Sequence, residues 1–241
     1  MLRKLVNELA DIVYPKVCLA CRSKIVDGSI DGLICAQCWA RIKKTVPPFC
    51  VACGRHLEKI SVNKNICVPC LKMRLHFDRA YSPCSYEGVI QKLIQEFKYK
   101  GKRRLGLPLS KLMVQFIKEY KLPMDIIDYV IPVPLHNTRL REREFNQAET
   151  LCRHICLEFS KSTPPGILQR IRNTRTQTEL EPGERQENVS GSFSVARSGI
   201  VKGKHILLVD DVLTTGATCS EAARALKNSG AGVVFALTLA N

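Results

Sequence analysis

The sequence predicts an α/β protein with a mainly parallel sheet, preceded by a small cysteine-rich module. Eight of its 12 cysteines lie in closely spaced pairs before residue 71, whereas the rest of the chain alternates strand-like and helix-like segments. With 45% apolar and 24% charged residues, the 241-residue chain has the composition of a globular protein and not of a disordered or fibrous one. We expect two domains, residues 1–80 and 81–241, because short turn-rich loops give way to longer periodic segments at about residue 80.

The N-terminal segment is predicted to be an amphipathic helix that ends at Pro15. Its apolar residues follow helical spacing, and Asn7, Glu8 and Asp11 interrupt the apolar stretch that a secretory signal needs. No run of about 18 apolar residues occurs, so we expect no membrane span and a cytoplasmic protein. In that compartment thiols stay reduced, and clustered cysteines are more often metal ligands than disulfides.

The cysteine pairs form an internal repeat with the ligand count of two zinc sites. Four C-x-x-C pairs occur, and shifting the first two by 32 positions superimposes them on the last two without a gap. A C-x-x-C turn directs two thiolates at one ion, and two such turns complete a tetrahedral set of four ligands with no open position. We therefore predict two structural Zn²⁺ ions, held by Cys18, Cys21, Cys35, Cys38, Cys50, Cys53, Cys67 and Cys70.

Other interpretations of the cysteine pairs fit the sequence less well. Disulfides are disfavoured in a reducing compartment, a thioredoxin-like redox site needs one C-x-x-C in a βαβ unit, and the spacing matches neither common ferredoxin pattern. Each ion is held most simply by the cysteines of one repeat, although an interleaved pairing is also consistent with the sequence. The other cysteines lack partners at ligand spacing, and we expect buried apolar roles for them: Cys84, Cys152, Cys156 and Cys219.

After about residue 80 the predicted helices and strands alternate. Helical spacing occurs over 86–99, 105–120, 145–160 and 216–229, and buried strands are predicted over 126–133, 205–209 and 233–239. Such alternation implies right-handed crossovers and a parallel sheet, and ligand sites in these folds gather at the carboxyl ends of the strands.

The chain is strongly basic, with 37 Lys and Arg against 22 Asp and Glu and a formal net charge of +15. This balance favours polyanionic partners such as nucleic acid, phosphates or an acidic membrane face. Phe97 and Tyr99 alternate with cations, so this stretch is a candidate for binding the backbone and bases of single-stranded DNA. A charge run is more often a solvated face, and the two aromatic residues could equally belong to the core of the preceding helix. The candidate DNA-binding cations are Lys98, Lys100, Lys102, Arg103 and Arg104.

The most informative segment, 205–218, begins as a buried strand and ends in a loop of small residues that opens a helix. Asp210 and Asp211 follow the apolar strand residues, where paired carboxylates can accept hydrogen bonds from ribose hydroxyls or help to hold Mg²⁺. The loop offers backbone N–H groups, threonine hydroxyls and the positive end of a helix dipole, which suit a phosphate monoester. The competing interpretation is a simple helix cap, since Asp and Thr are good N-caps, but the length and order of the motif disfavour it. The predicted ribose 5-phosphate ligands are Asp210, Asp211, Thr214, Thr215, Gly216, Ala217 and Thr218.

Residues 206–218, ILLVDDVLTTGAT, resemble the phosphoribosyl pyrophosphate motif of type I phosphoribosyltransferases. The wider chain, over almost all of residues 15–241, resembles the ComF family, which implies a type I phosphoribosyltransferase-like parallel-sheet domain behind a double zinc ribbon. One departure is Glu144, where we expect glycine, and it leaves the local loop geometry open. Behind the cysteine pairs, the resemblance rests on Tyr86-Glu87-Gly88, Phe97-Lys98-Tyr99-Lys100-Gly101, Ile131-Pro132-Val133-Pro134-Leu135, Arg143-Glu144-Phe145-Asn146-Gln147, Arg172 with Thr174, Thr176 and Gln177, and Arg185 with Asn188-Val189.

The same resemblance implies a pyrophosphate site. Arg139, Arg141 and Arg143, expected in the loop after the strand near residue 126, would lie near the pyrophosphate, which would carry Mg²⁺. Residues 172–188 have the character of a mobile lid over the site, to which the resemblance assigns Arg172, Gln177 and Arg185. No catalytic residue is assigned.

The ComF family is linked to the uptake and use of external DNA. The resemblance therefore implies a protein of natural transformation that binds phosphoribosyl pyrophosphate and single-stranded DNA, with a DNA-uptake helicase as a candidate partner. An alternative is an active phosphoribosyltransferase that transfers ribose 5-phosphate to a base or amine in nucleotide salvage. Thr214 stands where purine-salvage relatives have an acidic residue, which disfavours a 6-oxopurine acceptor. A third interpretation is a regulator that binds phosphoribosyl pyrophosphate without turning it over.

Overall fold

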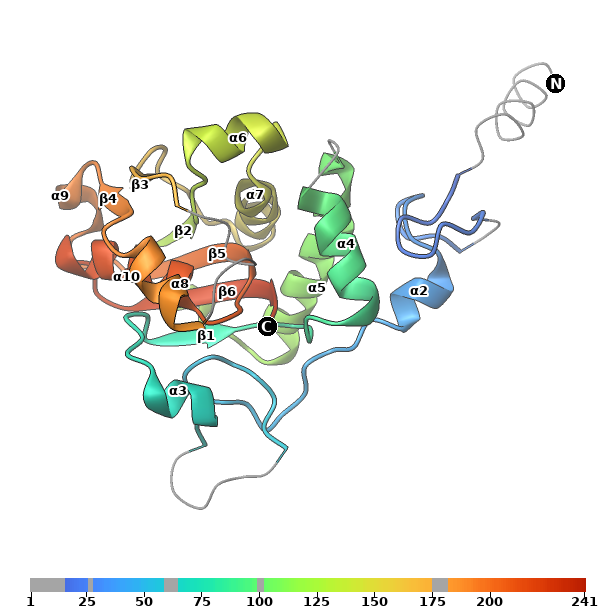
Figure 1. Cartoon of the computed structure of the whole chain (residues 1–241), viewed down its shortest axis with the longest axis horizontal. Helices are drawn as coiled ribbons and strands as arrows, with labels where there is room; N and C mark the ends of the chain where they lie inside the picture. The colour runs from blue at the N-terminus through green and yellow to red at the C-terminus, as the bar shows by residue number, and fades with distance from the viewer. Residues whose placement is uncertain (1–15, 26–27, 59–64, 99–101, 175–181) are drawn as a thin grey trace.

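The computed structural model describes residues 16–25, 28–58, 65–98, 102–174 and 182–241. Its centre is a four-stranded sheet with other elements on both faces, and the two copies of the cysteine repeat lie on different sides of the molecule (Figure 1). The helix predicted at the N-terminus lies outside the described residues.

The central sheet is parallel throughout, with the strand order β1-β6-β5-β2. β5 (Ile206–Val212) pairs with β6 (Val234–Ala240) on one side and with β2 (Tyr129–Pro132) on the other. The short strand β1 (Arg79–Tyr81) pairs with the outer edge of β6. β5 and β6 are buried on both faces, which is why their sequences are nearly continuous apolar runs. The predicted parallel sheet is confirmed.

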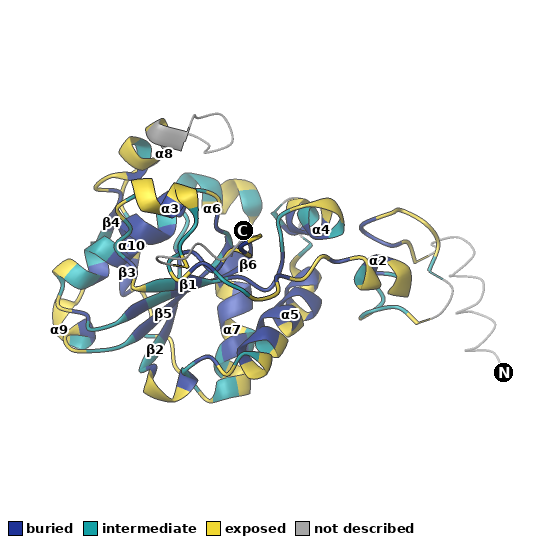
Figure 2. Ribbon diagram, turned by 90° about the horizontal axis from the view of Figure 1, so that it is seen from below, coloured by how far each residue is buried: buried dark blue, intermediate teal, exposed yellow. Residues whose placement is uncertain are grey.

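Three helices form one covering layer: α4 (Gly88–Lys98), α5 (Gly106–Glu119) and α7 (Gln147–Phe159). A short 3₁₀ turn, Arg103–Leu105, precedes α5. Their apolar faces meet alternate residues of the sheet, and Figure 2 shows the buried strands between the layers. In α4 the buried side chains recur at helical spacing, so one face of this helix belongs to the core: Ile90, Leu93, Ile94 and Phe97.

The opposite face of the sheet is covered by α10 (Ala217–Asn228) and by a small antiparallel pair, β3 (Leu168–Arg170) with β4 (Phe193–Val195). α8 (Pro182–Val189) contacts α10, and α9 (Ser198–Val201) lies just before β5 in the chain. Ile206 and Leu208 of β5 point to this side, whereas Leu207 and Val209 belong to the other core cluster.

The two copies of the cysteine repeat lie on different sides of the molecule. α2 (Ala36–Ala40) of the first copy lies beside α4, and α3 (Val68–Lys72) of the second lies near β1 (Figure 1). Accordingly, the first copy contributes Cys18 and Ile34 to the core cluster of the α4 face, and the second contributes Cys50 and Leu57 to the cluster of the α10 face. The boundary predicted between residues 80 and 81 falls inside β1.

The structure differs from the sequence expectations at several short elements. The segment after β2, expected as a loop, forms the helix α6 (Asn137–Arg143), which His136 caps by accepting a hydrogen bond from the Thr138 N–H. The predicted strand over 126–133 begins later, because Met124–Ile126 forms a 3₁₀ turn. β5 continues to Val212 and so includes both aspartates of the predicted site. Among the described helices, none has the length and hydropathy to cross a membrane.

Candidate functional site

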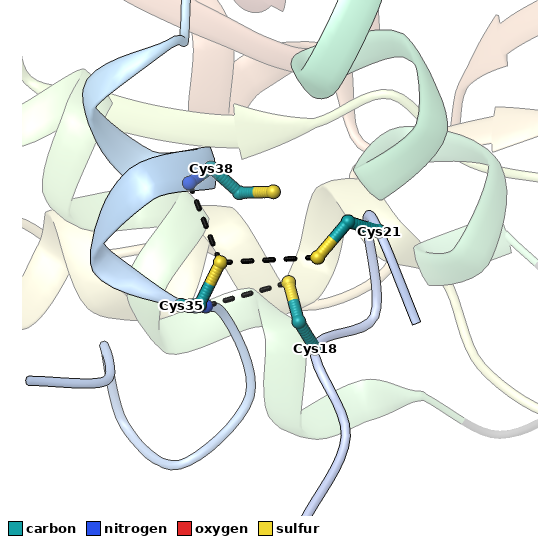
Figure 3. A group of neighbouring side chains, drawn as sticks. All are labelled: Cys18, Cys21, Cys35 and Cys38. Atoms are coloured by element: carbon teal, nitrogen blue, oxygen red, sulfur yellow. Dashed lines mark hydrogen bonds between the residues drawn. The ribbon is translucent and has the colours of Figure 1, made fainter. Parts of the chain in front are cut away.

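The eight paired cysteines form two compact clusters, one from each copy of the repeat. Cys18, Cys21, Cys35 and Cys38 make the first cluster (Figure 3), and the four Sγ atoms within each cluster lie within 4.8 Å of one another. Each cluster thus contains the four cysteines of one repeat, and the described structure does not show the interleaved arrangement that the sequence also allowed. The Sγ atoms of Cys21 and Cys35 are 3.9 Å apart, and those of Cys53 and Cys67 are 3.6 Å apart. Tetrahedral zinc with bonds of about 2.3 Å requires sulfur separations of about 3.8 Å, so both clusters fit the ion.

The local structure of the two clusters is also repeated. Cys35 and Cys67 each precede a short helix, α2 and α3, on which the fourth cysteine of the cluster lies. The backbone N–H of Cys35 donates to Cys18 Sγ at 3.4 Å, and the N–H of Cys67 donates to Cys50 Sγ at 3.3 Å. Such N–H donors stabilise the thiolates that zinc requires. The four cysteines per cluster leave no open coordination position, which is typical of a structural metal.

A cavity of about 630 Å³ opens beside the carboxyl ends of β2 and β5. This is the position at which parallel α/β sheets bind ligands. Its walls come from α4, α6, α7, β3 and the loop after β5. The charged and polar lining residues are Gln95, Lys98, Arg139, Arg143, Asn146, Gln147, Arg170, Asp210, Asp211, Thr214 and Thr218.

Two carboxylates and one ammonium group meet in the cavity. The Lys98 Nζ is 3.2 Å from an oxygen of Asp211, and both side chains are largely buried. Burial and the charge of Asp211 raise the pKa of Asp210 to about 7, although Lys98 and Arg170 oppose part of this shift. Burial alone would lower the pKa of Lys98, but the two carboxylates raise it above its usual value. The cavity therefore holds an acidic pair whose charge is partly compensated by a lysine that reaches in from the end of α4.

The loop after β5 carries the predicted phosphate ligands. Gly216 immediately precedes α10 and has a φ of 77°, a left-handed conformation that favours glycine. Thr214 is exposed, and Thr215 accepts a hydrogen bond from the Ala217 N–H with its hydroxyl oxygen at 3.4 Å. The loop thus brings backbone amides and two threonines that line the cavity, Thr214 and Thr218, to the start of a 12-residue helix.

Three arginines line the cavity: Arg139 and Arg143 on α6, and Arg170 at the end of β3. Arg139 and Arg170 both donate to Thr174, at its carbonyl oxygen and its hydroxyl respectively. Burial, with the positive charges of Arg139 and Arg143, lowers the pKa of Arg170 to about 10. In the part of the chain that the structure describes, the buried Nε of Arg170 has no hydrogen-bond partner. Guanidinium groups so close together are suited to an anion with several negative charges.

Arg170 is a charged cavity residue that sequence reasoning missed, and Gln95 is a polar one. Arg170 stands in the QRIRNT stretch two residues before Arg172, which was singled out instead. Because residues two apart on a strand point to the same side, strand alternation does not distinguish Arg170 from Arg172. β3 ends at Arg170, and with 3 residues it is too short for the sequence to show that end, so the sequence offered no means to choose between the two arginines.

The other residues predicted for the pyrophosphate site are placed differently. Arg141 is exposed on α6, and exposed Arg172 donates to the Asn188 carbonyl oxygen at 3.1 Å. Gln177 lies outside the described residues. Arg185 lies on α8, where its side chain is outside the described part of the structure.

The predicted DNA-binding cations separate into two environments. Lys98 faces the acidic pair in the cavity, whereas Arg103 and Arg104 are exposed and Lys102 is partly exposed at the start of the 3₁₀ turn before α5. Phe97 is fully buried against Phe145, with ring centroids 5.5 Å apart, which confirms the core alternative for this residue. Tyr99 and Lys100 lie outside the described residues.

Glu144, the one departure from the expected motif, adopts the conformation that glycine would favour. It ends α6 with a φ of 66°. A non-glycine residue in this region is strained by about 1 kcal/mol. The following Asn146 and Gln147 still anchor the segment, because their side chains donate to the carbonyl oxygens of Val133 and Phe97.

Comparison with known proteins gives two matches to families and several relatives along the chain. Residues 9–77 match the double zinc ribbon domain, and residues 150–241 match the phosphoribosyl transferase domain. Competence protein F of Haemophilus influenzae is 29% identical, across 88% of this chain and 91% of that protein. Competence protein ComFC of Bacillus subtilis is 28% identical, across 97% of this chain and 98% of that protein. The DNA utilization protein YhgH of Escherichia coli K12 is 27% identical, across 92% and 96%. The two cysteine clusters are therefore zinc sites of a double zinc ribbon.

Proposed function

Because this chain belongs to the ComF family, in which a double zinc ribbon precedes a phosphoribosyltransferase domain, we propose that it binds phosphoribosyl pyrophosphate or a related ribose 5-phosphate. The observation that carries the proposal is one cavity that holds an acidic pair, three arginines and a glycine loop at a helix start. Relatives are named as competence and DNA utilization proteins. We extend the proposal to a cytoplasmic role in natural transformation, alongside a DNA-uptake helicase.

Three parts of the cavity, which differ in charge, would each bind a different group of the proposed ligand. Asp210 and Asp211 would accept hydrogen bonds from the ribose hydroxyls, as oxygen acceptors suited to neutral donors. The loop that contains Gly216 would bind the 5-phosphate through its amides and threonine hydroxyls. The pyrophosphate would lie near Arg139, Arg143 and Arg170, whose shared positive charge needs a multivalent anion.

The acidic pair also fits Mg²⁺. This ion prefers oxygen ligands and usually binds through one or two carboxylates together with substrate phosphates, which Asp210 and Asp211 and the pyrophosphate would provide. When bound, the ion would neutralise the negative charge that develops on pyrophosphate as it leaves.

Calorimetry on the full chain tests this assignment with two ligands, ribose 5-phosphate and phosphoribosyl pyrophosphate, each with and without Mg²⁺. The double variant Asp210→Asn/Asp211→Asn should bind both ligands at least about tenfold more weakly. Arg170→Ala should lose about tenfold in affinity for phosphoribosyl pyrophosphate and less than about threefold for ribose 5-phosphate, because only the former carries a pyrophosphate. Asp31→Asn, an exposed carboxylate on the first ribbon, is the control. If the wild-type chain binds neither ligand, the proposal fails.

We further propose that Lys102, Arg103, Arg104 and Lys100 contribute to single-stranded DNA binding, whereas Lys98 serves the cavity. Exposed cations at the start of α5 support this division, together with the net charge of +15. With Phe97 in the core, base stacking would have to come from residues other than this one.

Fluorescence anisotropy with a labelled oligothymidine over a salt series tests the DNA proposal. Affinity should fall with salt, and Lys102→Ala/Arg103→Ala/Arg104→Ala should reduce the slope of log K against log salt by about two to three. Lys118→Ala/Lys121→Ala/Arg153→Ala removes the same charge from the C-terminal end of α5 and from α7, and should change the slope by less than about one. If the two triple variants change the slope equally, DNA binding reflects only the net positive charge of the protein, and the assignment of the site to Lys102, Arg103 and Arg104 is wrong.

A second candidate function is turnover of phosphoribosyl pyrophosphate. Tyr86, Gln95 and Leu135 also line the cavity, and an aromatic ring, an amide and an apolar side chain are suited to a flat base or amine acceptor. Release of pyrophosphate with a panel of bases, present in the wild type and absent in Asp210→Asn/Asp211→Asn, would support a transferase. Binding without release would favour a sensor of this ligand.

A further inference from the structure

The segment that leaves the second zinc ribbon packs against the loop of the proposed ribose-phosphate site. A Cβ atom placed on Gly216 would lie 3.4 Å from Leu75 Cδ2 and 3.5 Å from Phe77 Cζ. Phe77 is buried, and it shares a core cluster with Leu213 of the loop and Cys219 of α10. These two side chains therefore form the wall behind the loop, opposite its solvent side.

Hydrogen bonds through Ser220 extend this contact to the first turn of α10. The His76 N–H donates to the Ser220 Oγ at 3.0 Å, and the Ser220 N–H donates to the Gly216 carbonyl oxygen at 2.8 Å. Ser220 is 4% exposed, so water cannot easily replace these partners. Residues 75–77 thus contact the loop and the helix start together.

The other end of this segment depends on the zinc cluster. Cys70 is the last ligand of the second ribbon, and only five residues separate it from His76. The first C-x-x-C turn of this ribbon, between Cys50 and Cys53, is hydrogen-bonded to β1: the Ala80 N–H donates to the Ala52 carbonyl oxygen at 2.7 Å. The Asn241 side chain donates to the Cys53 carbonyl oxygen at 3.2 Å. Zinc would bind all four of these cysteines together. It would therefore connect the segment that contacts the loop with the part of the ribbon that is hydrogen-bonded to the sheet edge.

The first ribbon has different neighbours. Arg22 and Asp31 form ion pairs with Glu96 of α4 and Lys111 of α5. The segment that leaves the first ribbon forms main-chain hydrogen bonds at Lys43 and Thr45 with Ser85 and Pro83, and not with the ligand loop. Figure 1 places α2 on the far side of α4 from α10. Its zinc is therefore an internal control for the second.

We propose that the second zinc ribbon, through Leu75, His76 and Phe77, holds the loop at Gly216 in its ligand-binding shape, so that zinc in this ribbon and ribose phosphate bind cooperatively. The inference rests on the proposed ribose-phosphate site. Both ligands order the same loop, so binding of one lowers the free-energy cost of ordering for the other, and each must raise the affinity of the other. The first zinc has no such linkage.

The reciprocal effect is measured by transferring zinc from the full chain to a chromogenic chelator, with and without saturating ribose 5-phosphate. Cys21→Ser removes one of the four ligands of the first cluster and leaves all four of the second, so the release phase that it leaves unchanged belongs to the second ribbon. We expect ribose 5-phosphate to slow zinc release from the second ribbon at least about fivefold, and from the first less than about twofold. No slowing, or equal slowing of both phases, overturns the proposal.

A second test keeps both zinc sites intact. Phe77→Ala removes the ring behind the loop, and we expect amide exchange at residues 217–219 to rise about tenfold and ribose 5-phosphate affinity to fall about fivefold. Trp39→Ala, a partly buried aromatic side chain of the first ribbon, should change both by less than about twofold. Equal changes in the two variants, or none in Phe77→Ala, overturn the proposal.

The two tests separate this proposal from the one on which it rests. If the wild-type chain does not bind ribose 5-phosphate, the proposed function fails, while amide exchange in Phe77→Ala without ligand still decides whether the ribbon holds the loop. If ribose 5-phosphate binds and neither zinc release nor amide exchange responds, the function stands and the cooperativity is wrong.

Discussion

Arg22 and Gly54 occupy the same place in the two copies of the cysteine repeat, one residue after the second cysteine, and both have a left-handed backbone. Arg22, with a φ of 66°, is exposed and pairs with Glu96 of α4. Gly54, with a φ of 72°, is buried, and a Cβ there would lie 2.5 Å from the Ala80 carbonyl oxygen. The same turn thus accommodates a side chain in the first ribbon, whereas in the second ribbon a side chain would collide with β1.

This difference shows how the two ribbons are attached. Between its cysteines, the first contacts the helices α4 and α5 through side chains, including two ion pairs in which the cation is exposed. Its main-chain hydrogen bonds to the domain come from the segment after the cysteines, where Lys43 and Thr45 pair with Ser85 and Pro83. The second approaches β1 closely enough for main-chain hydrogen bonds and covers the edge of the sheet. A metal module attached by its main chain is held in one position relative to the domain, so its ordering can affect the ligand loop.

The largest expected effect comes from Gly54→Ala. The added Cβ overlaps a backbone oxygen and strains the left-handed residue, so we expect a loss of about 3 kcal/mol or more in the free energy of unfolding. Arg22→Gly at the matching position should change stability by less than about 1 kcal/mol. Urea unfolding of both variants with zinc present checks this; similar losses would show that the attachments are alike.

The next effect concerns the acidic pair, which faces Lys98 of α4. The pKa of Asp210 is about 7 in the folded state, above its unfolded value, so its ionisation destabilises the fold as pH rises. Asp210→Asn cannot ionise and should therefore be more stable than the wild type at pH 8, on the order of 1–3 kcal/mol. The gain should shrink as pH falls from about 7 to about 4 and disappear below the unfolded pKa of about 3.9. Unfolding at pH 4.5, 6 and 8 measures it, and a gain independent of pH would contradict this account.

A smaller effect on stability, that of Glu144→Gly, separates the cost of a left-handed backbone from the cost of a steric overlap such as that in Gly54→Ala. Glu144 has a left-handed φ of 66° and an exposed side chain, so Glu144→Gly should gain about 1 kcal/mol in stability. If this gain is as large as the loss in Gly54→Ala, strain alone explains the glycine in the second ribbon and the contact with Ala80 does not matter. Thermal unfolding of the two variants under the same conditions makes the comparison.

The smallest effect is the coupling between Arg22 and Glu96. The Arg22 side chain is 56% exposed and that of Glu96 20%, and an ion pair that one solvent-exposed partner forms contributes about 1 kcal/mol or less. A double-mutant cycle with Arg22→Ala and Glu96→Ala should give a coupling of that size that weakens with added salt. A larger, salt-independent coupling would mean that the first ribbon is held as firmly as the second.

Features with a local chemical pattern were predictable from sequence. The repeat of C-x-x-C pairs predicted two clusters of four thiols because a tight turn fixes the direction of two neighbouring side chains. The apolar run before Asp210 predicted a buried strand that leads into a glycine loop and a helix, because each step uses residues adjacent in the chain. Arg139 and Arg143 were also placed in the cavity, although on a helix and not in a loop.

Features that depend on distant contacts were decided by the tertiary structure. From the sequence, Lys98 was predicted to belong to a surface cluster of cations. Only the approach of α4 to β5 in the fold brings its Nζ to 3.2 Å from an oxygen of Asp211. Arg170 enters the cavity from a strand too short to show alternation. The two zinc ribbons are identical in ligand spacing, yet one lies against α4 and the other against β1 and the ligand loop. The sequence determined that there are two metal-binding turns and one phosphate loop, because bonds along the chain build each of them. The fold decided which turn supports the loop, because that contact joins residues that approach one another only when the sheet has formed.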